Sequence, residues 1–167
     1  LGGVFGLVVK GTDGKPKFAG VSRCGSLCIL LSQSQYKLIV FGGGATAEAL
    51  LKPVFDTGVA MFNVYGQTET CGIVTATDAG ASTQIMAETF GKPLPGARLR
   101  IADAEGNALP IGETGEIQVH GPYCMSGYFG RPEATAEAFT SDGYLRTGDL
   151  GVEHLDGNFS FVGRLKE

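Results

Sequence analysis

The sequence Asn63-Val64-Tyr65-Gly66-Gln67-Thr68-Glu69-Thr70 decides how the rest of the chain is interpreted. It ends a β-rich run at residues 59–64 with an aromatic ring, a glycine, hydroxyls and a carboxylate. This order suits a nucleotide site, because Tyr65 offers a flat face to a base and Gly66 lets the backbone approach a ligand closely.

The polar end of this stretch suits the phosphates of a nucleotide. Thr68 and Thr70 offer hydroxyls, and Glu69 offers the hard oxygen ligands that Mg²⁺ takes together with substrate phosphates. A second polar cluster lies farther along the chain at residues 144–150, where Asp149 supplies a carboxylate suited to ribose hydroxyls. Each of the two segments therefore offers groups suited to part of a nucleotide.

A strand–helix–strand pattern surrounds the first stretch. A strand predicted over residues 36–41 ends in Gly42-Gly43-Gly44, Thr46 is expected to cap the helix that follows, and residues 59–64 form the next strand. That order indicates a βαβ unit with two parallel strands, whose ligands lie beyond the carboxyl ends of the strands. We therefore expect the glycines and residues 65–70 to line one crevice. Four apolar residues of the helix recur at helical spacing and are expected to face the core: Leu50, Leu51, Val54 and Phe55.

After Gly91 the chain changes to short segments in which apolar and polar residues alternate, which is typical of an antiparallel sheet or barrel. The elements expected there are strands near residues 97–102, 116–120 and 160–162 and a short helix over residues 132–139. We therefore predict an α/β chain. A partial parallel βαβ sheet layer forms a nucleotide-binding subdomain over residues 1–90, and a small antiparallel β-barrel-like subdomain follows over residues 91–163.

Composition narrows the class of protein. The 167 residues include 43% hydrophobic and 18% charged side chains, which predicts a folded core rather than disorder. A formal net charge of −4 argues against nucleic acid as the main partner, and no apolar run is long enough for a membrane span. The four cysteines form no CxxC pair and lie far from both histidines, which argues against zinc. Scattered thiols are typical of a reducing cytosol, so we expect a cytoplasmic protein.

Several segments together resemble one family, the adenylate-forming enzymes, which comprise the acyl- and aryl-CoA synthetases with their luciferase and peptide-synthetase relatives. The matching segments, in the order in which that family has them, are residues 42–45, 65–70, 91–96, 115–121, 126–129, 131–135, 144–150 and 163–166. The resemblance implies a two-step reaction. A carboxylate attacks the α-phosphate of ATP to give an acyl-adenylate and pyrophosphate, and a thiol, usually that of coenzyme A, then displaces AMP.

The resemblance also implies roles for residues in the adenosine site. Gly43, Gly44 and Ala45 would form one wall of the adenine slot, and Tyr65 would stack on the base from the other side. Three further residues of the first stretch, Asn63, Gly66 and Gln67, complete the cofactor-binding set around the base, although Gln67 also suits a plain turn.

Other residues would handle the phosphates and the ribose. The resemblance implies that Thr68 and Glu69 are the catalytic pair, with Thr68 bonded to a phosphate and Glu69 holding Mg²⁺. Asp149 would bind the ribose hydroxyls with Arg164 nearby, and Lys166 stands at the family's hinge. Because the substrate carboxylate is the nucleophile, positioning and charge stabilisation would carry the catalysis without a nucleophilic side chain.

The chain departs from the family pattern at both ends. It stops at Glu167, so residues 164–167 are expected to be only the start of the hinge, without the C-terminal domain and its catalytic lysine. We therefore expect this chain alone to be inactive. Near the front, residues 11–17 resemble the family's phosphate loop, but Phe18 replaces its last glycine. A degenerate phosphate loop and a hairpin turn between strands at residues 7–10 and 18–21 both fit.

Three functions fit this sequence. The first is a segment of an ATP-dependent carboxylic acid–CoA ligase of the acyl-CoA synthetase type, such as those of fatty acid metabolism. The second is a non-catalytic AMP-binding remnant, and the third is an adenylation domain that loads a carrier protein. The sequence determines neither the carboxylic acid, nor the thiol partner, nor the oligomeric state.

Overall fold

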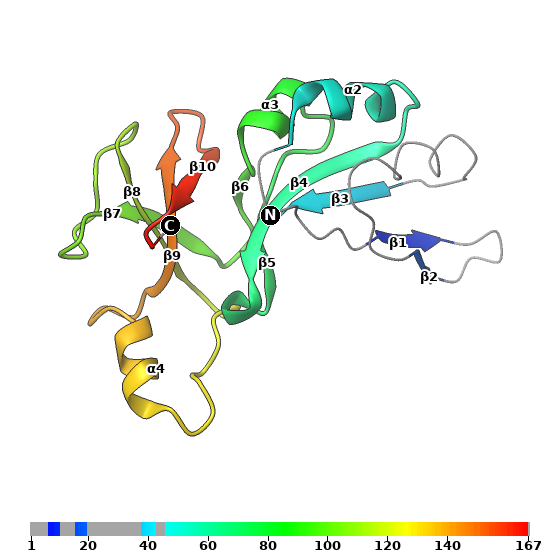
Figure 1. Cartoon of the computed structure of the whole chain (residues 1–167). Coiled ribbons are helices and arrows are strands. Elements are labelled where there is room, and N and C mark those ends of the chain that lie inside the picture. Colours follow the sequence, from blue (N-terminus) through cyan, green and yellow to red (C-terminus); the bar gives the residue numbers. More distant parts are fainter. Residues whose placement is uncertain (1–6, 11–15, 20–37, 43–45, 167) are drawn as a thin grey trace.

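The computed structural model describes residues 7–10, 16–19, 38–42 and 46–166 (Figure 1). Three sets of residues singled out in the sequence lie outside this described part. They are the glycine loop at Gly43, Gly44 and Ala45, residues 11–15 of the segment that resembles a phosphate loop, and the two cysteines Cys24 and Cys28.

A short hairpin begins the described chain. Strand β1 (Leu7–Lys10) pairs antiparallel with β2 (Pro16–Ala19). The prediction of two paired strands is confirmed, although the second strand begins two residues before the expected 18–21. Because residues 11–15 lie outside the described part of the chain, the choice between a phosphate loop and a plain turn stays a prediction.

The first sheet contains the predicted βαβ unit. Its strand order is β3-β4-β5-β6, formed by Leu38–Gly42, Ala60–Gln67, Gly72–Ala76 and Lys92–Pro93. Strands β3 and β4 are parallel and are joined by α2 (Glu48–Phe55), which confirms the expected unit. Strands β5 and β6 add to it in antiparallel pairs, so the sheet is mixed. In Figure 1, α2 and α3 (Thr83–Glu88) lie together on one side of this sheet.

Helix α2 buries only part of the face that its sequence predicts. Leu51 and Val54 are buried, whereas Leu50 and Phe55 keep 45% and 38% of their surface exposed. The helix has only eight residues and presents a single narrow stripe to the core. Leu50 lies beside that stripe and Phe55 ends the helix, so the expectation that all four face the core is wrong for these two.

The start of α2 also differs from the prediction. The N-cap residue is Ala47 rather than Thr46, and no side chain of the described residues caps the helix. Glu48, in the first turn, accepts a hydrogen bond from Thr83 Oγ1 at 2.7 Å. This hydrogen bond attaches the first turn of α2 to α3. Local sequence patterns do not predict it, because the two residues are 35 positions apart.

Strand β4 runs farther than predicted, to Gln67 rather than to Val64. Its last residues pair with β5, because β3 has already ended with Gly42 opposite Val64. Tyr65 therefore lies within a strand, just past the end of the parallel pair. Strand β4 ends two residues later, and the turn Thr68–Thr70 follows it.

The second sheet has the order β10-β9-β8-β7 and is antiparallel throughout (Figure 1). Its strands are β7 (Arg98–Ala102), β8 (Thr114–His120), β9 (Leu145–Glu153) and β10 (Phe159–Arg164). Helix α4 (Pro132–Ala138) precedes β9 and begins with its proline, as predicted. Nowhere in the described part of the chain is a helix long and apolar enough to cross a membrane.

The prediction of a barrel-like second half is wrong. The described strands β7 and β10 lie at opposite edges of an open sheet. A barrel buries its inner side chains by pairing its edge strands. Here the first sheet covers that apolar face instead, since Tyr65, Val74 and Phe90 pack in one cluster with Ile117 and Phe159. The neighbouring layer buries the face, so closure is not needed.

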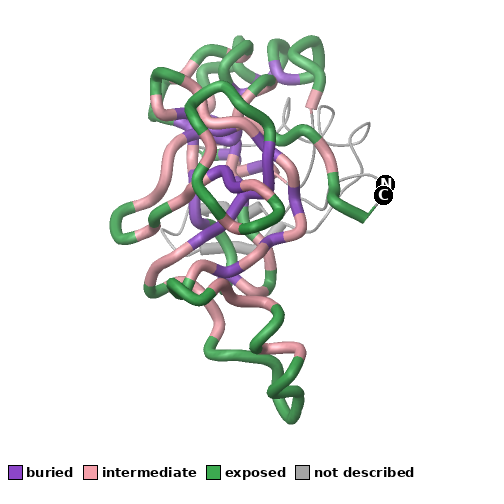
Figure 2. The backbone as a smooth tube through the Cα atoms, turned by 90° about the vertical axis from the view of Figure 1, so that its left-hand side faces the viewer, coloured by how far each residue is buried: buried purple, intermediate pink, exposed green. Residues whose placement is uncertain are grey.

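Two clusters of buried apolar side chains hold the described elements together. The first joins α2 and α3 to β3 and β4, and its members are Ile39, Phe41, Leu51, Val54, Met61 and Met86. The second joins the two sheets, and its members are Tyr65, Val74, Phe90, Ile101, Ile117, Val119 and Phe159. Figure 2 shows the buried segments gathered in the middle of the molecule. Each such side chain contributes roughly 1.5–3 kcal/mol on burial, so the second cluster stabilises the contact between sheets.

Main-chain hydrogen bonds also connect the two sheets. The Phe90 N–H donates to the Phe159 carbonyl at 2.8 Å, and the Phe159 N–H donates to the Gly91 carbonyl at 2.9 Å. These bonds lie at the expected boundary between residues 90 and 91. The division into parts at residues 1–90, 91–163 and 164–167 stays a prediction.

Candidate nucleotide site

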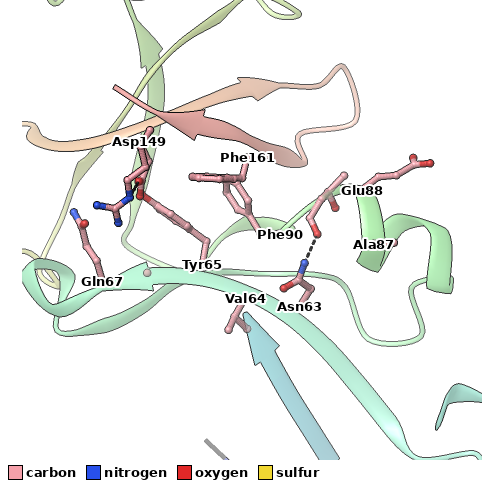
Figure 3. Close-up of a pocket in the computed structure, with 12 residues that line it drawn as sticks. Asn63, Val64, Tyr65, Gln67, Ala87, Glu88, Phe90, Asp149 and Phe161 are labelled. Atoms are coloured by element: carbon pink, nitrogen blue, oxygen red, sulfur yellow. Dashed lines mark hydrogen bonds and ion pairs between the residues drawn. The ribbon is translucent and has the colours of Figure 1, made fainter. Parts of the chain in front are cut away.

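Strand β4 aims the Tyr65 side chain at the second sheet (Figure 3). The ring stacks on Phe90 with centroids 4.7 Å apart, and only 8% of the residue is exposed. The hydroxyl donates to Asp149 Oδ2 at 2.8 Å. Burial raises the pKa of Tyr65 well above its ordinary value, so the hydroxyl keeps its proton and acts as a donor.

Asp149 is the buried charge of this site, with 3% of the residue exposed. Its Oδ1 lies 3.0 Å from Nε of Arg164, which stands directly opposite in the β9–β10 pair. The guanidinium sits off the direction of a hydrogen bond, and Oδ1 accepts none from the described residues. A buried carboxylate oxygen without a donor is costly. Among the described residues, Oδ1 therefore has the ion pair with Arg164 as its partner and keeps a hydrogen-bonding position that no donor fills.

A bulge in β9 turns Asp149 toward Tyr65. Gln118 of β8 lies opposite Arg146, and Glu116 lies opposite Leu150, so β9 has two more residues than β8 over this stretch. The extra length includes Gly148 with a φ of 72°, a left-handed conformation that suits glycine. Bulges of this kind re-aim side chains beside functional sites.

A cavity of about 160 Å³ opens beside Tyr65 and Asp149. Four elements contribute to it: β4, the end of α3 with the loop after it, β9 and β10. The lining residues are Asn63, Val64, Tyr65, Gly66, Gln67, Ala87, Glu88, Thr89, Phe90, Asp149, Phe161 and Arg164. Whole small-molecule pockets hold roughly 300–1,000 Å³, so the described residues enclose only part of such a pocket.

The other predicted base-site residues line this cavity but also have structural contacts. Asn63 is buried, and its Nδ2 donates to the carbonyls of Met86 and Thr89 at 2.9 and 2.7 Å, which holds the end of α3. A Cβ on Gly66 would lie 1.8 Å from the Gly72 carbonyl oxygen. Close approach to β5 therefore already requires this glycine, before any ligand is considered.

The predicted catalytic pair lies outside the cavity lining. Thr68 is exposed at the start of the turn after β4. Glu69 accepts a hydrogen bond from the Tyr128 hydroxyl at its Oε1, at 3.0 Å. The structure thus brings Tyr65, Asp149 and Arg164 together, and it does not bring Glu69 into contact with them.

The donor set still fits Mg²⁺. Among the described residues, no three histidine, cysteine, aspartate or glutamate side chains are grouped as a metal site. Magnesium in proteins commonly takes one or two carboxylates and completes its shell with substrate phosphates and water. A half-buried carboxylate such as Glu69 meets that requirement.

Thr70 does not offer its hydroxyl to a phosphate, contrary to the expectation. The residue is fully buried, and its Oγ1 accepts from the Gln67 N–H at 2.9 Å. The same hydroxyl lies within bonding distance of the Gln67 and Gly72 carbonyls, at 2.9 and 2.8 Å. Thr70 therefore closes the turn between β4 and β5, which occupies its hydroxyl.

Sequence reasoning missed two aromatic residues of the cavity, Phe90 and Phe161. Figure 3 shows both rings beside Tyr65. Phe161 was detectable, because it follows Phe159 by two positions and alternate residues of a strand share one face. Phe90 lies in a loop and carries no periodic signal.

Comparison with known proteins agrees with this geometry. Residues 11–129 match the family described as AMP-binding enzyme. The chain therefore belongs to the AMP-binding, adenylate-forming family. It is 35% identical over 139 residues to a long-chain-fatty-acid–CoA ligase of Thermus thermophilus, covering 77% of this chain and 26% of that protein. It is 37% identical over 134 residues to an indoleacetate–CoA ligase of Aromatoleum aromaticum, covering 80% and 26%.

The fold is also similar to solved structures of the O-succinylbenzoate coenzyme A synthetase of Bacillus subtilis. The complex with AMP matches with a TM-score of 0.72 and 32% identity over 84% of this chain and 29% of that one. The complex with ATP and magnesium ion matches with a TM-score of 0.71 and 30% identity over 84% and 30%. The chain spans about a quarter of the length of the curated relatives it matches.

Proposed function

We infer that this chain is the adenosine-binding segment of an ATP-dependent carboxylic acid–CoA ligase. Membership in the AMP-binding family supports this, and so does the similarity to ligases that use coenzyme A. The observation that carries the proposal is the contact of Tyr65 with Asp149 across 84 positions of sequence, beside a cavity.

In this proposal the ribose binds at Asp149. Oδ1 accepts a ribose hydroxyl beside its ion pair with Arg164, which balances the charge, while Oδ2 stays bonded to Tyr65. Hydrogen bonds to a charged group contribute about 1.5–3 kcal/mol. The adenine stacks on the ring of Tyr65, which contributes roughly 1–3 kcal/mol. Asn63, Gly66 and Gln67 line the base, and the wall expected at Gly43, Gly44 and Ala45 lies outside the described residues and stays a prediction.

The phosphates would extend from the ribose toward the turn after β4. Thr68 offers an exposed hydroxyl to a phosphate oxygen, and Glu69 offers its carboxylate to the metal. Bound Mg²⁺ neutralises charge that builds on the phosphates. The hydroxyl of Tyr128 bonds to Oε1 of Glu69, so Oε2 is the oxygen that we propose for the metal.

The reaction that we propose for the whole protein has two balanced steps. An oxygen of the substrate carboxylate forms a bond to the α-phosphorus while the bond to the pyrophosphate oxygen breaks, and pyrophosphate leaves. The sulfur of coenzyme A then attacks the acyl carbon, AMP leaves with the bonding electrons, and the thiol proton passes to solvent. The chain's own residues bind and orient the nucleotide throughout, and positioning of this kind can lower a barrier by several kcal/mol.

The 167 residues by themselves are expected to act as a nucleotide-binding module. Relatives of similar sequence are about three times as long. We therefore propose that this chain binds AMP and releases little or no pyrophosphate. Cys71 and Cys124 are free thiols, which suits the reducing cytoplasm that we propose as its location.

Calorimetry with AMP and ATP, combined with a pyrophosphate-release assay, tests this proposal. We expect saturable AMP binding and no pyrophosphate release above background with fatty or aromatic acids. Robust acyl-adenylate formation by this chain would refute the binding-module role, and no binding of either nucleotide would refute the adenosine site itself.

A further inference from the structure

Glu116 of β8 is a buried carboxylate with three donors and no place in the site described above. Only 7% of the residue is exposed. Its Oε1 accepts from the Gly148 N–H at 3.2 Å, and its Oε2 accepts from Gln118 Nε2 at 3.0 Å and Arg146 Nη1 at 3.2 Å. Each partner is a donor, so the position requires a group that only accepts, and an ionised carboxylate meets that requirement.

The bond to Gly148 reaches into the bulge that aims Asp149. In a regular antiparallel pair, a main-chain carbonyl would accept this N–H. The bulge takes Gly148 out of the ladder, and the Glu116 carboxylate supplies the acceptor instead. Asp149 is the next residue, so the carboxylate fixes the backbone directly before the ribose-binding side chain.

A second contact from the same strand fixes the other side of the bulge. Thr147 Oγ1 donates to the Ile117 carbonyl at 2.6 Å and accepts from the Asp149 N–H at 3.1 Å. Glu116 and Ile117 are adjacent, so two neighbouring residues of β8 hold the turn from both sides. The Gly148 carbonyl also accepts from the Leu165 N–H at 3.0 Å, whereas a Cβ at Gly148 would meet no atom of the described residues within 4 Å.

The donors around Glu116 are themselves oriented. Arg100 Nε donates to Gln118 Oε1 at 2.9 Å, which leaves the Gln118 amide nitrogen to face Glu116. Arg100 is in turn held by both oxygens of Asp142 and lies 3.9 Å from the ring centre of Tyr144. A row of hydrogen-bonded polar side chains therefore crosses the second sheet and ends at Glu116. Glu116 in turn bonds to the bulge at Gly148.

We propose that Glu116 is a positioning residue for Asp149, which sets the geometry of ribose recognition without touching the nucleotide. This inference rests on the proposed adenosine site. The competing explanation is that Glu116 only neutralises Arg146 and stabilises the sheet. The two differ in one measurable quantity, because only the positioning role affects how strongly the site prefers a nucleotide that has ribose hydroxyls.

The test measures the affinity of the 167-residue chain for AMP and for 2′,3′-dideoxy-AMP, by calorimetry, and takes the ratio of the two dissociation constants. The wild-type chain should prefer AMP about tenfold or more, since one or two hydrogen bonds to a charged group are at stake. Glu116→Gln has nearly the same shape, but its amide nitrogen must face either the Gly148 N–H or the other two donors. We expect it to reduce the preference about threefold or more.

Two further variants complete the design. Glu116→Ala removes the acceptor and should abolish most of the preference, while Glu113→Ala removes an exposed carboxylate just before β8 and should leave the preference unchanged. If Glu116→Ala does not fold, the isosteric Glu116→Gln still decides. An unchanged ratio in Glu116→Gln, with both affinities reduced equally, would overturn the positioning role alone. A wild-type chain that does not prefer AMP would overturn the adenosine site and the positioning role together.

Discussion

Replacing Asp149 by alanine is the sharpest perturbation of the proposed site. The substitution removes the buried carboxylate that accepts from Tyr65 and whose Oδ1 is the proposed acceptor for a ribose hydroxyl. A hydrogen bond to a charged group contributes about 1.5–3 kcal/mol, which corresponds to a loss of AMP affinity of roughly 10- to 150-fold. Removal of a negative charge also reduces repulsion of the AMP phosphate, which offsets the loss by less than about 1 kcal/mol when screened by salt.

Calorimetry on folded protein measures that loss, and circular dichroism melting reports the separate effect on stability. The Tyr65 hydroxyl loses its acceptor, and a buried donor left without a partner costs about 1–3 kcal/mol of folding free energy. Asp78→Ala is the matched control, because it removes an aspartate whose side chain is 66% exposed and lies outside the cavity lining. An Asp149→Ala chain that stays folded and binds AMP as tightly as the wild type would refute the reasoning.

Three further predictions follow from other contacts. Tyr65→Ala should weaken AMP binding about tenfold or more, because it removes the stacking face, and calorimetry that finds unchanged affinity would remove Tyr65 from the site. Glu69→Gln should abolish the Mg²⁺-dependent part of ATP affinity while leaving AMP affinity within about twofold, and an unaltered response to Mg²⁺ in titrations would exclude Glu69 as the metal ligand. The hydrogen bonds from Arg100 lower the pKa of Asp142 to about 2. The folded-state pKa is depressed, so the stabilisation is present above the unfolded value of about 3.9 and is lost as the pH falls toward 2. The melting temperatures of the wild type and Asp142→Asn should therefore differ by a constant amount between pH 5 and 7 and converge below pH 4, and a constant difference at every pH would contradict this.

The sequence predicted the elements whose signals are local. The parallel pair of β3 and β4 was predictable, because two apolar runs flank a helix with amphipathic spacing. The antiparallel strands of the second half were predictable from alternation of polar and apolar residues. The segment 144–150 was recognised only as a motif, and its place in the nine-residue strand β9 was not, because glycines interrupt its alternation.

The errors come from contacts between distant segments. The second half does not close into a barrel, because Tyr65 and Val74 of the first sheet, with Phe90 of the loop after α3, cover its apolar face. Leu50 is exposed because an eight-residue helix buries a single stripe. Thr70 turns inward because β5, which the sequence did not reveal, folds back directly after it. Periodicity along the chain contains none of this information.

The candidate site likewise has a part that the sequence predicted and a part that only the structure shows. Periodicity and composition identified Tyr65 and Asp149 as chemically suitable, but only the family resemblance implied that they act together. The structure supplies that contact, at 2.8 Å. Glu116 lies in segment 115–121, which resembles the family, but the sequence assigned it no role, since its importance comes from a bulge in the neighbouring strand.

A crystal structure of this chain with AMP is the decisive test of the proposed adenosine site. We expect the ribose hydroxyls to lie within hydrogen-bonding distance of Asp149 Oδ1 and the adenine to stack on the ring of Tyr65. A nucleotide bound elsewhere on the chain, with Asp149 still in contact only with Tyr65 and Arg164, would contradict the proposed site.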